Sequence, residues 1–324
     1  MTVDLLTLGE SMVSLRSGGP LSAGGSLSMH VAGAESNVAV GVARLGHSVA
    51  WAGVVGGDPH GEFILRQLRS EGLAVQHRVD AARATGVMFL ERRTADISRA
   101  YYYRAGSAGS TICREDVDRA FAAGPRVLHL TGITAALSPD ARRAVEYAAA
   151  RGAAEGLVVS LDVNYRSKLW SRDEARAVLT PLARHASVLV ASDDELGLVA
   201  DGGGAAGGTD PDGAELALAA ELLDRGVQEV VVKRGAAGAG VHTAAGRWEA
   251  PAVPVTSIDT VGAGDAFTAG YLSALLDGGD IAERLRRGTL AGAFAVSTAG
   301  DCEGLPSAAE LALLGAAPDG STQR

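Results

Sequence analysis

Aromatic residues and cysteines are scarce in this sequence, and long apolar runs are missing. Aromatics make up 4% of the chain, so alanine, leucine and valine must form most of the core. The two cysteines, Cys113 and Cys302, form no Cys-x-x-Cys motif and no zinc-like cluster with histidines, which excludes a disulfide scaffold and indicates a reducing compartment. No apolar run of about 18 residues predicts a membrane helix, and the first residues do not resemble a secretory leader. We therefore expect a cytoplasmic protein.

Lysine is also scarce, because Lys168 and Lys233 are the only two in the chain. The net charge of −9 and the pI near 5.3 exclude a whole-surface attraction to nucleic acid or to acidic membranes. Any bound anion then needs a local site. A length of 324 residues with 47% apolar and 21% charged residues predicts one large globular domain, with at most a small appendage.

From about residue 126 the sequence alternates short β-branched runs with helical segments. Helix signals separate the runs: Ser138 and Pro139 open a helix that Gly152 closes, and Ser171 with Glu174 has the spacing of a capping box. A similar pair, Asp212 with Glu215, opens a helix that ends at Gly226. The predicted strands span residues 126–130, 157–161, 187–190 and 227–232. This alternation predicts βαβ units and a parallel sheet.

The first third of the chain adds two strands and two helices to that sheet, at residues 3–8, 49–55, 36–45 and 61–69. Residues 11–33 and 85–105 break the alternation, and we interpret them as antiparallel strands of a small β-lid. The predicted α/β domain then consists of residues 1–10, 34–84 and 106–314. Residues 201–213 are too rich in glycine for regular structure, and residues 315–324 are expected to form a flexible tail.

The clearest chemical signal is the segment Asp-Thr-Val-Gly-Ala-Gly-Asp-Ala-Phe at 259–267, which opens a helix that runs to about Leu276. Gly262 and Gly264 let the backbone approach a ligand closely, and the N–H groups at a helix N-terminus stabilise negative charge. Asp265 beside this turn has two readings: a general base for a hydroxyl that attacks a phosphoryl group, or a helix cap. The residues alone leave these two open.

Other nucleotide and hydrolase motifs are missing. Neither lysine lies in a P-loop, Phe267 stands where a dinucleotide fingerprint has its third glycine, and there is no Gly-x-Ser-x-Gly or His-Glu-x-x-His. The segment at 259–267 closely resembles the C-terminal signature of the ribokinase-like (PfkB) family of carbohydrate kinases. Residues 33–46 and 53–63 resemble the N-terminal signature region of that family, so the resemblance extends from Leu8 to about Leu305.

The resemblance implies an α/β fold with a doubly wound, mostly parallel sheet flanked by helices and a β-lid over the sugar. It makes Asp265 the catalytic base, and it makes the backbone of Gly262, Ala263 and Gly264 the anion hole. Asp259 would lie near a monovalent cation site, which would take K⁺.

The same resemblance implies ATP and Mg²⁺. Lys233, Gly235 and Gly238 match the Lys-x-Gly-x-x-Gly loop that lies along the nucleotide in this family, although a tight turn at the end of a strand also explains the glycines. In the family's Asn-x-x-Glu element, Ser192 replaces the asparagine and Glu195 matches the glutamate. Glu195 would hold Mg²⁺ through water, and the alternative is an acidic helix start.

Two groups of polar residues predict the acceptor. Asp162, Asn164 and Arg166 follow a parallel strand and share one face if the segment is extended, and Tyr102 and Arg104 share one face of a lid strand. Two guanidinium groups in one pocket are costly unless they meet an anion, so we expect a sugar acid.

Both groups resemble the 2-keto-3-deoxygluconate kinase branch of the family, in which such tyrosines and arginines bind the substrate carboxylate. Gly33, Ala34 and Asn37 match the sugar-contacting turn of that branch, with Ala32 in place of a common glycine. The expected reaction is transfer of the γ-phosphoryl group of ATP to O6 of 2-keto-3-deoxygluconate. A kinase for fructose, ribose or a nucleoside and a non-catalytic sensor remain as alternatives. We expect a homo-oligomer that pairs through lid edges.

Overall fold

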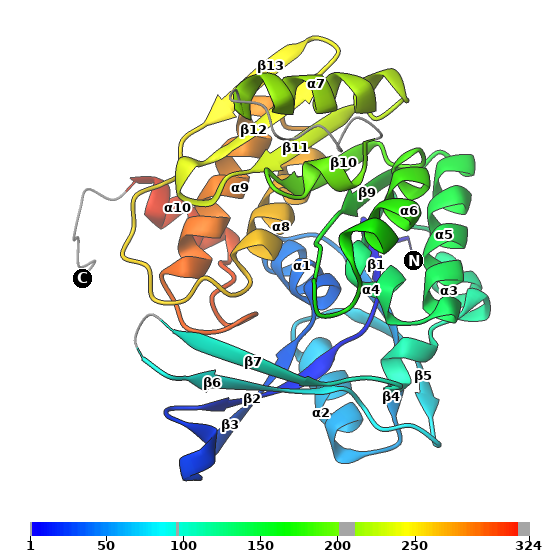
Figure 1. Ribbon diagram of the computed structural model, residues 1–324, viewed down its shortest axis with the longest axis vertical. Helices are drawn as coiled ribbons and strands as arrows, with labels where there is room; N and C mark the ends of the chain where they lie inside the picture. The colour runs from blue at the N-terminus through cyan, green and yellow to red at the C-terminus, as the bar shows by residue number, and fades with distance from the viewer. Residues whose placement is uncertain (1, 95–96, 201–210, 317–324) are drawn as a thin grey trace.

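The computed structural model describes residues 2–94, 97–200 and 211–316, which form two sheets surrounded by helices (Figure 1). Within these residues, nine strands make the larger sheet, in the order β13-β12-β11-β10-β9-β8-β1-β4-β5. Neighbouring strands from β11 to β5 pair in parallel, whereas β11, β12 and β13 pair antiparallel. The prediction of a doubly wound, mostly parallel sheet is therefore confirmed. Its strands are β1 (Leu5–Leu8), β4 (Val49–Gly56), β5 (Ala74–Asp80), β8 (Val127–Thr131), β9 (Val158–Asp162), β10 (Val188–Ser192), β11 (Glu229–Lys233), β12 (Ala239–Thr243) and β13 (Gly246–Ala250).

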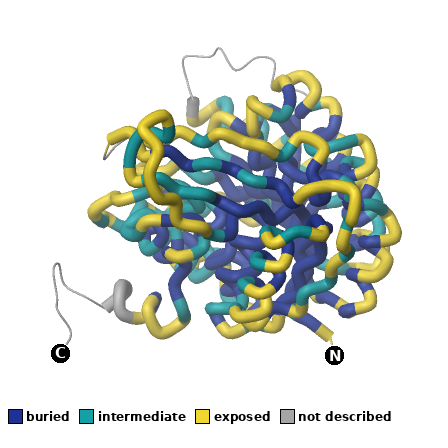
Figure 2. Tube along the Cα trace, turned by 90° about the horizontal axis from the view of Figure 1, so that it is seen from below, coloured by how far each residue is buried: buried dark blue, intermediate teal, exposed yellow. Residues whose placement is uncertain are grey.

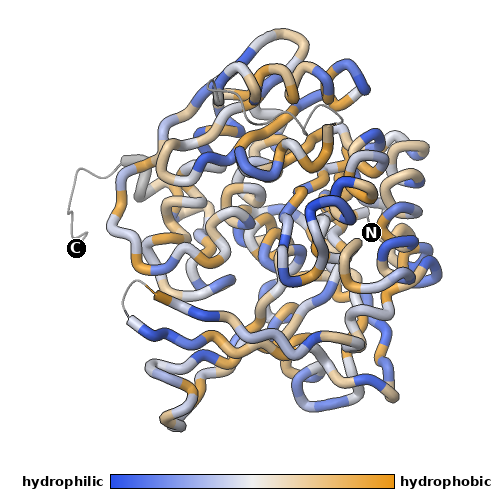
Figure 3. The backbone as a smooth tube through the Cα atoms, in the orientation of Figure 1, coloured by the Kyte–Doolittle hydropathy of each residue, from blue (hydrophilic) through white to orange (hydrophobic). Residues whose placement is uncertain are grey.

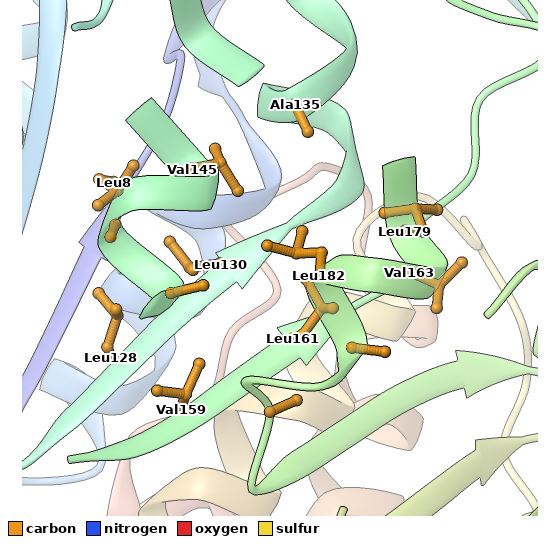
Figure 4. Packing of buried hydrophobic residues seen from close by; sticks show 14 of the residues in the cluster. Leu8, Leu128, Leu130, Ala135, Val145, Val159, Leu161, Val163, Leu179 and Leu182 are labelled. Atoms are coloured by element: carbon orange, nitrogen blue, oxygen red, sulfur yellow. The ribbon is translucent and has the colours of Figure 1, made fainter. Parts of the chain in front are cut away.

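The central strands are apolar along their whole length because both faces of the sheet are covered. Successive residues of β8 point to opposite sides: Val127 packs in one core cluster, and Leu128 and Leu130 pack in the other. Figure 4 shows the second of these clusters, where strand leucines meet helix residues such as Val145 and Leu179. Hydrophobic residues follow the inner strands in Figure 3, and Figure 2 shows that the buried segments lie at the centre of the molecule.

Two helical layers cover the larger sheet. On one side are α1 (Ala34–Arg44), α2 (Pro59–Ser70), α8 (Ala263–Leu276) and α9 (Ile281–Val296), and α10 (Ala308–Ala316) packs on α9. On the other side are α3 (Arg114–Phe121), α4 (Gly132–Leu137), α5 (Pro139–Ala154), α6 (Arg172–Ala183) and α7 (Pro211–Asp224).

Local signals place several helix starts. Ser138 accepts a hydrogen bond from the Ala141 N–H at the start of α5, and Ser171 and Glu174 form the predicted capping box of α6. The predicted start of α7 was wrong, because the helix begins at Pro211 and Asp212 lies inside its first turn. The predicted end at Gly226 is confirmed, because the helix ends at Asp224 and Gly226 follows with a φ of +103°. Residues 201–213 were expected to form a loop, but residues 211–213 are helical, in agreement with the preference of proline for the first helical position. Residues 201–210 lie outside the described residues.

The smaller sheet lies against the edge of the main body and has the order β3-β2-β6-β7 (Figure 1). Its strands are β2 (Met12–Ser17), β3 (Leu27–Ala32), β6 (Val87–Arg92) and β7 (Ser98–Tyr103). They lie within the two segments that break the alternation. The expectation of an antiparallel lid was wrong for one pair, because β2 and β6 run in parallel. β2 follows β1 and β6 follows β5 in the sequence, and β1 and β5 run in the same direction in the main sheet. The chain therefore enters β2 and β6 from the same side, and the two strands pair in parallel.

Other elements were not predicted. They include β5, α3 and the β12–β13 hairpin, and α10 extends to Ala316, so the first two residues of the expected tail at 315–324 are helical. The remaining tail residues, 317–324, lie outside the described residues. None of the helices in the described ranges is long and apolar enough to cross a membrane.

Candidate active site

A cavity of about 990 Å³ lies between the lid and the carboxyl ends of the parallel strands. Open α/β sheets bind ligands at this edge, because the loops that follow parallel strands meet there. The cavity brings together eight of the predicted site residues: Gly33, Ala34, Asn37, Tyr102, Arg104, Arg166, Gly262 and Asp265. Residues from the lid, from α1 and from α8 therefore face the same space, although they are far apart in the sequence.

The turn before α8 has the geometry that its glycines predict. Gly262 has a φ of +77°, and a Cβ there would lie 2.7 Å from the carbonyl oxygen of Asp301, so only glycine fits without strain. The helix begins at Ala263 and places Asp265 in its first turn. The N-terminus of a 14-residue helix thus opens beside the cavity, where its free N–H groups favour an anion.

Asp265 does not cap this helix, because Gly262 is the N-cap. Its carboxylate is buried and accepts hydrogen bonds from Asn37 Nδ2 at 2.8 Å and from Asn164 Nδ2 at 3.4 Å. Burial raises the pKa of Asp265; the Asn37 hydrogen bond opposes this shift, and the nearby Asp162 charge adds to it. A carboxylate held by two amides at the cavity wall is suited to accept a proton.

The segment after β9 is not extended, so the predicted shared face of Asp162, Asn164 and Arg166 was wrong. β9 ends at Asp162, and Asn164 takes a left-handed conformation with a φ of +43°, which asparagine tolerates better than most residues. Asn164 therefore turns to Asp265, while Arg166 lies exposed at the cavity rim. Asp162 is 1% exposed and does not line the cavity.

Lys233 pairs with Asp162 below the helix N-terminus. Its Nζ lies 2.8 Å from Asp162 Oδ2 and 3.3 Å from the place where a Cβ on Gly264 would be. Burial lowers the pKa of Lys233, but the Asp162 carboxylate outweighs this effect and holds the pKa above its ordinary value. A cation is therefore held next to the turn that would bind an anion.

Replacing Lys233 by Met is expected to reduce the free energy of unfolding by about 3–5 kcal/mol, because it leaves a buried carboxylate without its cation. Urea denaturation measures this loss. The double variant Lys233→Met/Asp162→Asn should recover much of it, since the unpaired charge is then gone. Equal stability of the single variant and the wild type would contradict the buried pair.

Arg104 is paired within the protein. Its Nε lies 2.7 Å from Glu10 Oε2, and Ser107 donates to the other oxygen of this buried carboxylate. The anion that Arg104 meets is thus Glu10. Arg166 is different, because among the described residues its guanidinium forms no ion pair and donates only to the carbonyl oxygen of Tyr165, at 3.0 Å.

Two further cations line the cavity, one on the same loop and one at the start of α6. Lys168 Nζ donates to the Ala100 carbonyl oxygen of β7 at 2.8 Å, and Arg172 donates to the Asp194 carbonyl oxygen at 2.7 Å. Neither has a carboxylate partner in the part of the chain that the structure describes. Arg166, Lys168 and Arg172 therefore place three cations at the cavity that form no ion pair with a carboxylate of the described residues.

Except for Gly262, the predicted nucleotide and metal residues do not line this cavity; they are Ser192, Glu195, Lys233, Gly235, Gly238, Asp259 and Gly264. Gly235 and Gly238 form the tight turn between β11 and β12, with positive φ values, and Ser192 Oγ donates to Asp194. Glu195 is buried and accepts hydrogen bonds from the N–H groups of Tyr165 and Ser192. It therefore joins the loops that follow β9 and β10.

The predicted cation residue Asp259 accepts from the Val261 and Gly300 N–H groups, so it joins the α8 turn to the loop that follows α9. The roles of this residue and of the nucleotide residues stay predictions.

Three buried carboxylates at the cavity were not found from the sequence: Glu10, Glu35 and Asp301. Glu10 follows the carboxyl end of β1, so the rule for open α/β sheets points to it. Asp301 lies in a loop without any periodic signal. Burial raises the pKa of Asp301 to about 7, the Arg16 guanidinium opposes this shift, and Asp265 contributes to it.

The raised pKa of Asp301 predicts a pH-dependent stability. In the folded protein Asp301 keeps its proton up to about pH 7, whereas in the unfolded chain it loses that proton near pH 4. The contribution of Asp301 to the free energy of unfolding is therefore fully present below pH 4, and it falls as the pH rises to about 7. The Asp301→Asn variant lacks this loss, so it should gain stability relative to the wild type between pH 5 and pH 8. Urea denaturation at both pH values tests this, and a constant difference would contradict the assignment.

Comparisons with known proteins agree with this geometry. The model of the pfkB family carbohydrate kinases matches residues 4–308. A 2-dehydro-3-deoxygluconokinase of Thermoproteus tenax is 36% identical over 95% of this chain and 93% of its own, and one of Bacillus subtilis (strain 168) is 34% identical over 96% and 95%.

Among solved structures, a putative ribokinase II from E. coli in complex with ATP and Mg²⁺ has a TM-score of 0.87 and 25% identity, covering 97% of this chain and 99% of that one. The fold, the glycine turn with its aspartate and the match along most of the chain all support the same family assignment. The chain belongs to the pfkB family of carbohydrate kinases.

Proposed function

We propose that this protein transfers the γ-phosphoryl group of ATP to the O6 hydroxyl of 2-keto-3-deoxygluconate. One observation carries the choice of a sugar acid: the cavity that contains Asp265 also has a rim of cations, Arg166, Lys168 and Arg172, with no carboxylate partner in the described chain. In a protein with a net charge of −9, such a local site favours an anionic substrate. The names of the two relatives support the same substrate.

In this proposal Asp265 takes the proton from the attacking hydroxyl. Asn37 and Asn164 hold its carboxylate at the cavity wall, where the sugar hydroxyl would bind. The N–H groups of residues 262–264 and the nearby Lys233 stabilise negative charge on the transferring phosphoryl oxygens. The lid excludes water that would otherwise hydrolyse ATP.

The residues present fit ATP and Mg²⁺. The oxygens Asp162 Oδ1 and Asn164 Oδ1 are buried and have no hydrogen-bond partner among the described residues, next to the helix N-terminus that would hold the phosphates. Oxygen ligands of this kind suit water-bound Mg²⁺, and Glu195 is a further candidate for such a contact. When bound, Mg²⁺ would neutralise charge on the phosphates. Ser192, Lys233, Gly235 and Gly238 are proposed to lie along the nucleotide, and Asp259 to contribute to a K⁺ site.

Arg166 is proposed to bind the substrate carboxylate and to hold the far end of the sugar. Arg104 contributes to the same end, with its position fixed by Glu10. Tyr102 lies over this arginine, with the guanidinium carbon 5.9 Å from the ring centroid. Gly33 and Ala34 at the start of α1 let the sugar approach the backbone. Binding at a distance from the reacting hydroxyl then contributes to positioning.

An ADP-release assay with purified protein tests this proposal. We expect the kcat/KM for 2-keto-3-deoxygluconate to exceed that for fructose, ribose and nucleosides. Preference for a neutral sugar would identify a family kinase of other specificity, and sugar binding without ADP formation would identify a sensor. Both outcomes would overturn the proposal. The galacto epimer belongs in the same panel.

We propose that the reaction takes place in the cytoplasm, where ATP is available. We also propose a homo-oligomer that pairs through the lid. Its edge strands β3 and β7 expose Leu27, Met29 and Tyr103. Light scattering tests the oligomer, and a monomer at micromolar concentration would contradict it.

A further inference from the structure

A cysteine that the proposed mechanism does not use is connected to the proposed base by two hydrogen bonds. The Cys302 thiol donates to Asn37 Oδ1, with a Sγ–Oδ1 distance of 2.7 Å. The Nδ2 group of Asn37 then donates to Asp265 Oδ2 at 2.8 Å. Burial raises the pKa of the Cys302 thiol well above its ordinary value, so the thiol keeps its proton and remains a donor.

These two hydrogen bonds fix the orientation of the Asn37 amide. An asparagine side chain has a donor end and an acceptor end, and a carboxylate only accepts. With a thiol donor on one side and the Asp265 carboxylate on the other, the oxygen of the amide faces Cys302 and its nitrogen faces Asp265. The reverse orientation would place the amide oxygen against the carboxylate and lose both bonds.

The two neighbours of Cys302 contact the lid. Asp301 Oδ2 lies 3.2 Å from Arg16 Nη2, and Glu303 Oε2 lies 3.3 Å from Arg16 Nη1. Glu303 also lies 2.6 Å from His30 Nδ1. Arg16 is on β2 and His30 is on the adjacent edge strand β3, so all three contacts come from the same side of the lid sheet. In Figure 1 the segment after α9 descends to this sheet.

The same segment also supports the anion-hole turn. The carbonyl oxygen of Asp301 lies against Gly262, where it leaves no room for a side chain, and the Asp301 side chain lines the cavity. Three consecutive residues therefore contact the lid, the glycine turn and the amide that holds the base.

We propose that residues 301–303 form a positioning segment that couples closure of the lid to the orientation of the Asp265 carboxylate. Cys302 acts on Asp265 through Asn37, and Asp301 and Glu303 hold the lid through Arg16. Cys302 is a positioning residue, because it does not line the cavity. The inference rests on the proposed role of Asp265 as the base.

Two substitutions of Cys302 separate positioning from packing. Cys302→Ser keeps a donor, and Cys302→Val keeps the bulk but removes the donor. The proposal predicts that the valine variant loses about tenfold in kcat with little change in the KM for ATP, whereas the serine variant stays near the wild type. A purely packing role predicts the opposite order, because an apolar site accepts valine better than a hydroxyl. Cys113→Val, at the other cysteine, is the matched control and should leave kcat unchanged.

A second measurement needs no turnover. The Asn37 hydrogen bond lowers the pKa of Asp265, so loss of the correct amide orientation should raise that pKa. Carboxyl ¹³C NMR of the full-length protein should show this rise in Cys302→Val and not in Cys302→Ser. An unchanged pKa in the valine variant overturns the inference even if the protein phosphorylates a sugar acid. A shifted pKa in a protein that phosphorylates no sugar overturns the proposed function instead.

The contact with the lid is tested by a double-mutant cycle. Arg16→Met removes the ion pairs that hold the lid to residues 301 and 303, and we expect the effect of Cys302→Val on kcat to be at least threefold smaller in this background. Arg99→Met, at an exposed position on the other edge of the lid, is the control background and should leave the effect unchanged. If Cys302→Val lowers kcat by the same factor in the Arg16→Met background as in the wild type, the two sites are not coupled and the inference is overturned.

Discussion

The Asp265→Asn variant should lose about 10²- to 10⁴-fold in kcat while it still binds ATP. Asparagine has the shape of aspartate but cannot accept the proton of the attacking hydroxyl. The proposed phosphate contacts come from the backbone of residues 262–264 and from Lys233, and the substitution changes neither of them. The ADP-release assay measures kcat, and isothermal titration calorimetry measures the Kd for ATP.

Asp277→Asn provides the matched control, because Asp277 is the C-cap at the opposite end of the same helix. This variant should keep the wild-type kcat. A near-normal kcat for Asp265→Asn would show that another group takes the proton. Urea denaturation of both variants establishes that a loss of kcat does not come from unfolding.

Arg166→Ala should raise the KM for a sugar acid by roughly 10- to 150-fold, because a charge-assisted hydrogen bond contributes about 1.5–3 kcal/mol. The kcat should change less, since Arg166 lies at the rim of the cavity and Asp265 is held by the two asparagines. Arg166→Lys should recover part of the loss, because lysine keeps the charge but not the planar fork. Steady-state kinetics with a sugar acid and with fructose measure the change in preference.

The control for this variant is Arg143→Ala, at an exposed arginine on α5 that pairs with Asp140 at the surface. It should leave both KM values unchanged. If Arg166→Ala weakens the acid and the neutral sugar equally, Arg166 does not bind the carboxylate.

The fold followed from local patterns where these patterns were strong. The buried strands β8 to β11 lie close to their predicted positions, because a sheet covered on both faces needs continuous β-branched runs. The edge strand β13 was missed because it lacks a continuous β-branched run. It carries Gly246, Arg247 and Glu249 and is mostly exposed. Proline at position 211 was a stronger helix signal than the glycines before it.

The site was predictable where one motif places several residues together. The turn at Gly262 and the position of Asp265 follow from local sequence, as does the meeting of loops at the strand ends. The ion pairs that shape the cavity were not predictable, because Glu10 and Arg104 are separated by 94 positions and Arg16 and Asp301 by 285. Such pairs depend on how the lid folds back onto the sheet, and no periodicity in the sequence encodes that.

The most direct test of the account is an experiment in which three possible acceptors compete for limiting ATP. The protein would be mixed with limiting ATP and equal concentrations of 2-keto-3-deoxygluconate, fructose and ribose, and the products would be identified by mass spectrometry and ³¹P NMR. The account predicts that the phosphoryl group is found on O6 of 2-keto-3-deoxygluconate. A phosphorylated neutral sugar as the main product would contradict it.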